Sequence, residues 1–184
     1  MQYYKYLDID WKPSAEKLKD YILNSRTEFL TSIKSSSWRN LNVKEVLEKV
    51  PELSVLFKPM GLTIHHMAFF VSDYTVGTIH IDHDRYSNCR INLPILNCEN
   101  TETRFYKTLV EPVKTLQANG VPFLNLDPAK CVQVDQFYLT QAVIFRNDQP
   151  HQVISNNTNT PRISCTIGFN EDIEYLFESL KPNT

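Results

Sequence analysis

The stretch Arg162-Ile163-Ser164-Cys165-Thr166-Ile167-Gly168-Phe169 alternates between polar or small side chains and large or apolar ones. Successive side chains of a β-strand point to opposite faces, so one face of this predicted strand is polar and the other is apolar. The same division occurs in Ile79–Asp82 and in Arg90–Ile95. An ordinary half-exposed sheet would turn the polar face toward water. If helices cover the apolar faces instead, the polar faces line the interior of a β-sandwich, where burial is costly unless they bind something.

The N-terminal third of the chain supplies candidate helices for that cover, and residues 1–60 are predicted to be helical. Apolar side chains after Pro13-Ser14 recur at the spacing of one helical stripe: Leu18, Tyr21, Ile22, Phe29, Leu30 and Ile33. Asn42 is a good N-cap for a second helix, because Glu45 follows three residues later as in a capping box. Pro51 is predicted to end this helix or to open a further short turn.

From about Ile64 the sequence changes to short β-rich runs separated by turn residues. The predicted strands are Ile64–Ser72, Val76–Ile81, Cys89–Leu96, Arg104–Tyr106, Pro122–Asn125, Cys131–Val134, Ala142–Arg146, His151–Ile154 and Arg162–Phe169. Many short strands at near-regular spacing predict a sandwich or barrel rather than alternating βαβ units. The chain has four glycines and no Gly-rich phosphate loop, which argues against a P-loop or Rossmann nucleotide site. We therefore expect a mainly β fold with N-terminal helices.

The length of 184 residues suits a single domain, 1–184, with one hydrophobic core. Within it we expect a helical support region at 1–60, a β core at 64–169 and a C-terminal helix in 170–184. The apolar side chains that this last helix is predicted to turn inward are Ile173, Leu176, Phe177 and Leu180.

The composition excludes several classes of protein. A hydrophobic content of 42% and a charged content of 22% are ordinary for a globular chain, so extensive disorder is not expected. The net charge of −2 offers no basic field for a nucleic acid. No apolar run is long enough to span a membrane, and the N-terminus lacks the apolar core of a signal peptide. The four cysteines lack zinc-site spacing, so we expect free thiols and a cytoplasmic protein.

The triplet His80-Ile81-Asp82 places an imidazole and a carboxylate on one face of a predicted strand, where both can grip one metal ion. Ile81 would point the other way and pack against the N-terminal helices. His151 follows a turn, and Arg162 opens the next predicted strand with Ser164 beside it on the same face. We expect these two strands to be adjacent and antiparallel, which would bring the groups into one cavity. The alternative for the triplet alone is a solvated strand face.

His80-x-Asp82, the distant His151 and Arg162-x-Ser164 together resemble the motif of Fe(II)/2-oxoglutarate-dependent oxygenases. The resemblance covers roughly residues 64–169 and implies a double-stranded β-helix, a jelly-roll or cupin-like fold. A looser likeness, over Arg90–Tyr106, is to small phage and bacterial hydroxylases related to prolyl and aspartyl/asparaginyl hydroxylases. The aspartyl/asparaginyl branch often lacks the carboxylate ligand, so Asp82 departs from that branch.

The resemblance implies a role for each residue of the motif. His80, Asp82 and His151 would hold Fe(II), while Arg162 and Ser164 would bind the C5 carboxylate of the co-substrate 2-oxoglutarate. Asn92, inward on its predicted strand, would hydrogen-bond the co-substrate or a metal ligand. The enzyme would convert 2-oxoglutarate and O2 to succinate and CO2 and hydroxylate a peptidyl side chain or a small molecule.

Two other functions stay open at the level of the sequence. One is a non-catalytic, cupin-like protein that binds a metal or a carboxylate, and the other is a metal-dependent hydrolase or isomerase. The segments 107–120 and 135–140 are expected to be loops at the substrate entrance. The protein is expected to be a monomer or a homodimer, without a nucleic-acid or membrane partner.

Overall fold

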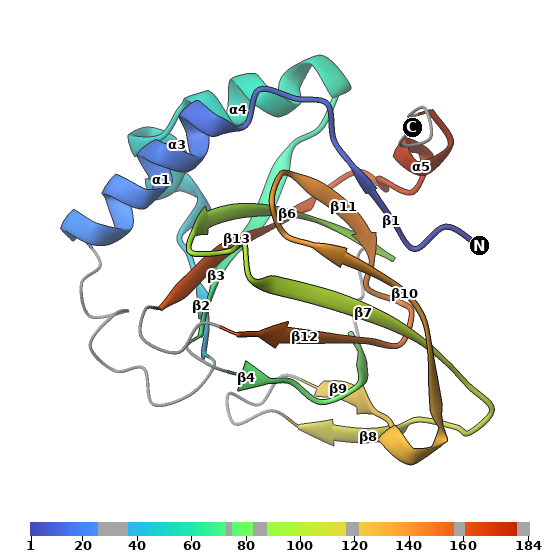
Figure 1. Cartoon of the computed structure of the whole chain (residues 1–184). Helices are drawn as coiled ribbons and strands as arrows, with labels where there is room; N and C mark the ends of the chain where they lie inside the picture. The colour runs from blue at the N-terminus through green and yellow to red at the C-terminus, as the bar shows by residue number, and fades with distance from the viewer. Residues whose placement is uncertain (26–36, 73–74, 83–87, 117–121, 157–160, 180–184) are drawn as a thin grey trace.

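The computed structural model describes the whole chain except residues 26–36, 73–74, 83–87, 117–121, 157–160 and 180–184. Two antiparallel β-sheets face each other, and helices cover the outer side of one of them (Figure 1). The fold is mainly β, with helices near the N-terminus, and is a double-stranded β-helix, or jelly roll. The sequence prediction of the fold class is therefore confirmed.

Each sheet combines strands that are far apart in the sequence. The six-stranded sheet has the order β1 (Tyr4–Tyr6), β11 (Val143–Arg146), β6 (Cys89–Leu96), β13 (Arg162–Phe169), β3 (Ile64–Ser72) and β2 (Ser37–Asn40). The other sheet has the order β10 (Cys131–Tyr138), β7 (Thr101–Thr108), β12 (His151–Ser155), β5 (His80–Asp82), β9 (Pro122–Asn125) and β8 (Val113–Leu116). Off this path, β4 (Thr75–Val76) pairs with β12.

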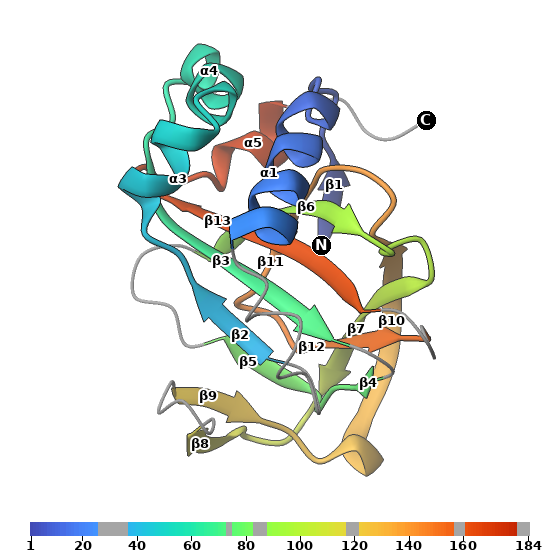
Figure 2. The same ribbon diagram turned by 90° about the vertical axis from the view of Figure 1, so that its left-hand side faces the viewer.

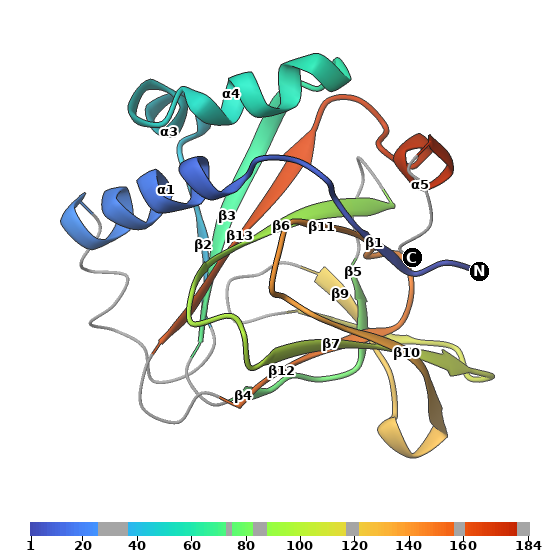
Figure 3. The same ribbon diagram turned by 45° about the horizontal axis from the view of Figure 1, so that its top comes forward.

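Three helices cover the six-stranded sheet on the side away from the other sheet: α1 (Lys12–Ser25), α3 (Val43–Lys49) and α4 (Glu52–Phe57) (Figures 2 and 3). Their side chains join those of the sheet in one core, in which Leu18, Ile22, Leu53 and Phe57 are fully buried together with Ile91, Leu93, Ile163 and Ile167. The helix η1 (Lys58–Met60) leads into β3, η2 (Pro128–Lys130) precedes β10, and α5 (Tyr175–Ser179) closes the described part of the chain.

The start of α3 follows the sequence prediction. The Asn42 side chain accepts a hydrogen bond from the backbone N–H of Glu45, with a nitrogen–oxygen distance of 3.3 Å. Glu45 does not complete the reciprocal half of a capping box, because its carboxylate accepts from the Tyr21 hydroxyl at 2.7 Å. That contact ties α3 to α1. Pro51 then stands at the N-cap of α4, so it opens a further helix as expected.

The polar face of β13 points inward, between the two sheets. Arg162 and Ser164 each expose 2% of their surface and Thr166 exposes 6%, while the alternating apolar residues contact the helices. Part of the interior beside this polar face is filled by an aromatic cluster of Tyr3, Phe105, Phe137 and Phe145, which also includes Cys98, Leu139 and Val143. Apolar side chains therefore fill one part of the interior, and polar side chains line another part.

Three short edge or flanking strands were not predicted. β1 and β2 lie within residues 1–60, which were predicted to be helical, and β8 lies within the predicted loop 107–120. The strand β10 also extends through most of the predicted loop 135–140. Runs of three or four residues show too few repeats to reveal a period of two, and their structure comes from pairing with other strands. The predicted helix positions Phe29, Leu30, Ile33 and Leu180 lie outside the described residues.

Two predictions about packing were wrong. Ile81 does not contact the N-terminal helices; it packs on the far side of the other sheet with Ile79, Tyr106 and Leu126. The strands β12 and β13 are not adjacent in one sheet, because β12 pairs with β7, β5 and β4, whereas β13 pairs with β3 and β6. The chain crosses from one sheet to the other between Ser155 and Arg162, so these strands face each other across the interior.

None of the helices in the described ranges has the length and apolar character needed to cross a membrane. The longest of them, α1, has 14 residues, whereas a spanning helix requires about 20.

Replacing Ile167 with Ala tests the helix-covered core. Ile167 is fully buried between β13 and the helices, so the substitution should lower the free energy of unfolding by about 2–5 kcal/mol. Urea denaturation followed by circular dichroism measures this loss. The matched control is Val132→Ala on β10, where the side chain is 69% exposed and the expected change is within about 0.5 kcal/mol. Equal losses in both variants would contradict the assigned direction of the β13 side chains.

Candidate metal centre

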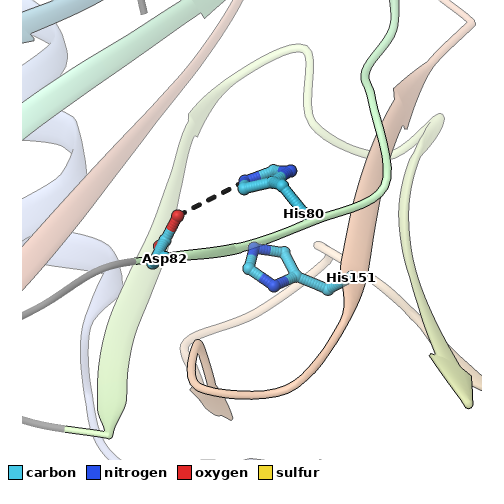
Figure 4. Close-up of side chains that lie close together, drawn as sticks. All are labelled: His80, Asp82 and His151. Carbon is cyan, nitrogen blue, oxygen red and sulfur yellow. Dashed lines mark ion pairs between the residues drawn. The ribbon is translucent and has the colours of Figure 1, made fainter. Parts of the chain in front are cut away.

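His80, Asp82 and His151 meet on the inner face of the sheet formed by β10, β7, β12, β5, β9 and β8 (Figure 4). His80 and Asp82 share a face of β5 because they are two residues apart. His151 opens β12 directly opposite His80 in the antiparallel register, and their ring centroids are 4.5 Å apart. The potential ligand atoms of the three side chains all lie within 4.8 Å of one another. The structure thus brings together the three residues that the sequence proposed as metal ligands.

Both imidazoles are oriented by backbone carbonyl groups. Nδ1 of His80 lies 2.9 Å from the carbonyl oxygen of Thr78, and Nδ1 of His151 lies 2.9 Å from that of Gln149. A carbonyl oxygen only accepts, so each Nδ1 carries the proton and donates it. The ring of His151 then presents an unprotonated Nε2 as a ligand, which is how metal-binding histidines are commonly held. Nε2 of His80 lies 3.3 Å from Oδ1 of Asp82 and donates to it, so this nitrogen must lose its proton before it binds a metal.

The three groups also influence one another electrostatically. Burial opposes the ionisation of Asp82, but the hydrogen bond from His80 and the positive charges of His151, His80 and Arg90 outweigh it and lower the pKa of Asp82 to about 2. Burial, followed by the charge of His80, lowers the pKa of His151 to about 4. Burial also favours the neutral form of His80, yet the hydrogen bond and charge of Asp82 leave its pKa raised. A carboxylate and a neutral imidazole are therefore present at neutral pH, as metal binding requires.

Aromatic rings enclose the histidines. The His151 ring, only 3% exposed, lies 5.6 Å from the Phe145 ring and 6.3 Å from the Phe105 ring, both of the aromatic cluster. Phe123 makes an edge contact with His80 at 5.6 Å. Asp82 remains the open side, with 38% of its side chain exposed. An ion held here would have apolar walls behind the histidines and access to solvent beside the carboxylate.

Arg162 lies inside the same sandwich, on the opposite sheet. Its Nε and Nη1 atoms are buried and have no hydrogen-bond partner among the described residues. The guanidinium contacts Cys98 and lies over the Phe70 ring, 5.4 Å from its centroid. Since Phe70 pairs with Ser164 in the register of β3 and β13, the guanidinium reaches the level of Ser164. Burial lowers the pKa of Arg162, but arginine remains a cation in proteins. Because an anion beside a buried cation stabilises it, Arg162 is a candidate anion-binding residue.

Asn92 faces the interior as predicted, beside Thr166 in the register of β6 and β13, and its Oδ1 is buried without a partner among the described residues. The sequence analysis missed Asn125, which pairs with His80 on β9 and also buries an unpartnered Oδ1. Only the register of β5 and β9 reveals it, because nothing in the local sequence marks this asparagine.

Three buried hydroxyl groups were also missed. Ser72 pairs with Arg162, and Thr101 pairs with Ser155, near the point where the chain crosses between the sheets. All three residues are fully buried, and their hydroxyl oxygens have no hydrogen-bond partner in the described part of the chain. A buried polar group without a partner destabilises the folded state, so this concentration of such groups indicates an interior prepared for a polar ligand.

The residues fit the groups that the sequence resemblance implied. Two imidazoles and one carboxylate are the donor set of non-haem Fe(II) sites. The neutral ring of His151, the ring of His80 after loss of its Nε2 proton and an ionised Asp82 can provide it. Nε and Nη1 of Arg162 are buried without a partner among the described residues, and a carboxylate is an anion that accepts hydrogen bonds from a guanidinium.

Solved structures with the same fold support the architecture. The chain is similar to SnoK, a non-heme alpha ketoglutarate dependent carbocyclase from nogalamycin biosynthesis, with a TM-score of 0.53 and 11% identity over 98% of this chain and 87% of that one. The epimerase SnoN, in complex with Fe3+, alpha ketoglutarate and nogalamycin RO, gives a TM-score of 0.51 and 12% identity over 89% and 77% of the two chains. AviO1 from Streptomyces viridochromogenes Tue57 gives 0.51 and 13% over 92% and 90%.

The chain therefore has the double-stranded β-helix fold found in Fe/2-oxoglutarate-dependent enzymes, as the sequence resemblance implied. No family model matches the sequence, and no curated protein matches it either. At 11–13% identity the likeness concerns the fold, so the chemistry rests on the residues of the interior.

Replacing His151 with Ala should reduce the affinity for a divalent metal at least about 100-fold, because losing even an outer partner of a ligand costs roughly 10–100-fold. Equilibrium dialysis with Fe(II) under anaerobic conditions, followed by metal analysis, measures the affinity. The control is Lys114→Leu, because Lys114 is exposed on β8 and is not one of the three candidate ligands. Similar affinities in the two variants would show that His151 does not bind the metal.

Proposed function

We propose that this protein is an Fe(II)- and 2-oxoglutarate-dependent dioxygenase. The observation that carries the proposal is the buried guanidinium of Arg162, in the same sandwich as the triad of His80, Asp82 and His151; two of its nitrogens have no partner in the described part of the chain. A metal site alone would suit many cupin-like proteins. A metal site combined with a buried carboxylate clamp suits a co-substrate that carries both a metal-binding 2-oxo acid and a distant carboxylate.

The chain's own residues would divide the work as follows. His80, Asp82 and His151 hold Fe(II), which with bound 2-oxoglutarate and O2 supplies an oxidant as the co-substrate becomes succinate and CO2. Arg162 and Ser164 bind the C5 carboxylate and so fix the orientation of the co-substrate. Asn92 and Asn125 offer amide groups that can hydrogen-bond the co-substrate or orient a ligand. The aromatic cluster behind His151 excludes water from that side of the metal.

We infer that the outcome for the substrate is a hydroxylation, on a peptidyl side chain or a small molecule. The support is the sequence resemblance to hydroxylases and the exposure of Asp82, which leaves one side of the triad accessible from solvent. We also infer a cytoplasmic location, supported by the four cysteines, which are all free thiols in the structure, as a reducing compartment maintains them.

Anaerobic addition of Fe(II) and 2-oxoglutarate should produce a weak visible charge-transfer band, and admission of O2 should then yield succinate. Replacing Arg162 with Leu should weaken 2-oxoglutarate binding at least about 100-fold, since hydrogen bonds to charged groups contribute about 1.5–3 kcal/mol each. Arg162→Lys should recover only part of the affinity, because an ammonium keeps the charge but lacks the planar fork. Titration of the band with 2-oxoglutarate measures all three affinities.

The control for these variants is Lys114→Leu, which removes an exposed cation on β8 and should leave the titration unchanged. Fe(II) affinity should also be the same in the wild type and in Arg162→Leu, because Arg162 does not belong to the triad. If iron-loaded, folded protein shows neither the band nor succinate, the protein is a metal-binding protein of another kind and the proposed function is wrong.

A further inference from the structure

The turn between β11 and β12, residues 147–150, carries the chain from the six-stranded sheet to the other sheet. His151, one of the three candidate metal ligands, begins β12 directly after this turn (Figure 4). Its Nδ1 donates to the carbonyl oxygen of Gln149, a residue of the turn, at a distance of 2.9 Å. The orientation of the His151 ring therefore depends on the conformation of the turn.

The same turn also holds Asp82. The backbone N–H of Asp82 donates to the carbonyl oxygen of Asn147 at 3.0 Å. Within the described ranges β12 pairs with β5 through His151 and His80 alone, so Asn147 connects the far end of β5 to the turn. The N–H of Asn147 in turn donates to the carbonyl oxygen of Asn88 at 3.1 Å. Two of the three candidate ligands, Asp82 and His151, are thus bound to carbonyl groups of one four-residue turn.

Arg146, the last residue of β11, is connected to this turn through its side chain. Its Nε donates to Oδ1 of Asp148 at 3.0 Å, and its Nη2 donates to Oδ2 of Asp148 at 2.8 Å. Because the planar guanidinium binds both oxygens of the carboxylate, this is the two-pronged geometry of strong ion pairs. The hydrogen bond to Asp148 is also the largest influence on the pKa of Arg146 and raises it. We call these two residues the Arg146–Asp148 pair.

Two further contacts surround the Arg146–Asp148 pair. Nη1 of Arg146 donates to Oε1 of Glu174, just before α5, at 2.5 Å. The side-chain amide of Gln149 donates to Oδ2 of Asp148 at 3.2 Å. The side chains of Arg146 and Asp148 are 15% and 26% exposed, and ion pairs in contact with water contribute little to the stability of a fold. The position of the pair at the start of the turn indicates a local role, which is to hold the conformation of the turn.

We propose that Arg146 is a positioning residue of the metal centre. By binding both oxygens of Asp148, it fixes residues 147–150 in the conformation in which two carbonyl groups of the turn bind Asp82 and His151. The ligand side chains then lie close together before a metal ion binds, so less conformational freedom is lost on binding. This inference deepens the proposed function and rests on it for the role of the triad as metal ligands.

Replacing Asp148 with Asn tests the pair, because the amide would place an NH2 group against an N–H donor of Arg146. The affinity for Fe(II) should fall at least about tenfold, since outer partners of metal ligands contribute roughly 10–100-fold. Anaerobic equilibrium dialysis followed by metal analysis measures the affinity. Arg146→Leu should cause a similar loss. The double variant should bind no more weakly than the weaker single variant, because both changes break the same pair.

A second measurement reports the geometry of the turn without any metal. In nitrogen-15 NMR of the histidine-labelled, metal-free protein at pH 7, His151 should carry its proton on Nδ1, the atom that donates to Gln149. The spectrum of His151→Ala assigns the signal. Asp148→Asn should shift His151 toward a mixture of both tautomers, because the turn no longer fixes the carbonyl acceptor. A loss of overall stability alone would leave the tautomer in the folded protein unchanged.

The matched control is Glu174→Gln, which removes the other carboxylate partner of Arg146 and keeps its contact with Asp148. Both the Fe(II) affinity and the His151 tautomer should match those of the wild type. Urea unfolding of each variant shows whether the protein used in the measurements is folded. If Arg146→Leu does not fold, Asp148→Asn decides the proposal, and if Asp148→Asn does not fold, Arg146→Leu decides it.

Unchanged Fe(II) affinity in folded Asp148→Asn, an unchanged His151 tautomer in that variant, or an equal loss in Glu174→Gln would each overturn the proposal. Failure of the proposed function gives a different result. The wild type would then bind Fe(II) and show no charge-transfer band with 2-oxoglutarate, while Asp148→Asn would still lose Fe(II) affinity. A normal band together with unchanged affinity in Asp148→Asn would refute only the role of Arg146.

Discussion

The burial of one face of the six-stranded sheet beneath α1, α3 and α4 is the constraint on which the rest of the structure depends. Ile163, Cys165 and Ile167 of β13 are fully buried against these helices, so their neighbours must point the other way. That places Arg162 and Ser164 between the sheets rather than in water. A one-residue shift of register would exchange the two faces and expose the helix-facing core, so the apolar contacts hold the polar residues inside.

This constraint has an energetic consequence for the interior. Among the described residues, two nitrogens of the buried Arg162 and several buried hydroxyl and amide oxygens lack a hydrogen-bond partner, and each such group lowers the stability of the folded chain. The apolar core beneath the helices contributes stability in the opposite direction. A carboxylate bound to Arg162 would remove most of the electrostatic penalty of burying this cation. Binding of such a ligand would therefore also raise the stability of the folded state.

Much of the fold could be predicted because alternation is a local property. β3, β6, β9 and β13 have the bounds that the sequence indicated, and Asn42 begins α3. β1, β2 and β8 could not be predicted, since three or four residues carry no clear period; β1 also pairs with a strand far away in the sequence. The misplacement of Ile81 has a related cause. The alternation of side chains along the strand showed that Ile81 points away from the metal ligands. It could not show that the outer side of this sheet, rather than the helices, lies there, because that depends on how the two sheets assemble.

The candidate site shows the same division. His80 and Asp82 could be paired from their spacing, and the resemblance supplied His151 and Arg162. The neighbours that complete the interior could not be found in this way: Asn125 is defined by the register of β9 with β5, and Phe145 by that of β11 with β6.

The metal triad and Arg162 lie on different sheets, so a ligand that contacts both must span the interior between the sheets. His80, Asp82 and His151 belong to the sheet of β5 and β12, whereas Arg162 belongs to that of β13, so backbone hydrogen bonds do not fix the distance between them. The packing between the sheets fixes it instead, and the aromatic cluster of Tyr3, Phe105, Phe137 and Phe145 is the part of that packing nearest to His151. Under the proposed function, the volume of these aromatic side chains would help to hold the metal ligands and Arg162 apart. It would thereby help to set the length of a co-substrate that reaches both.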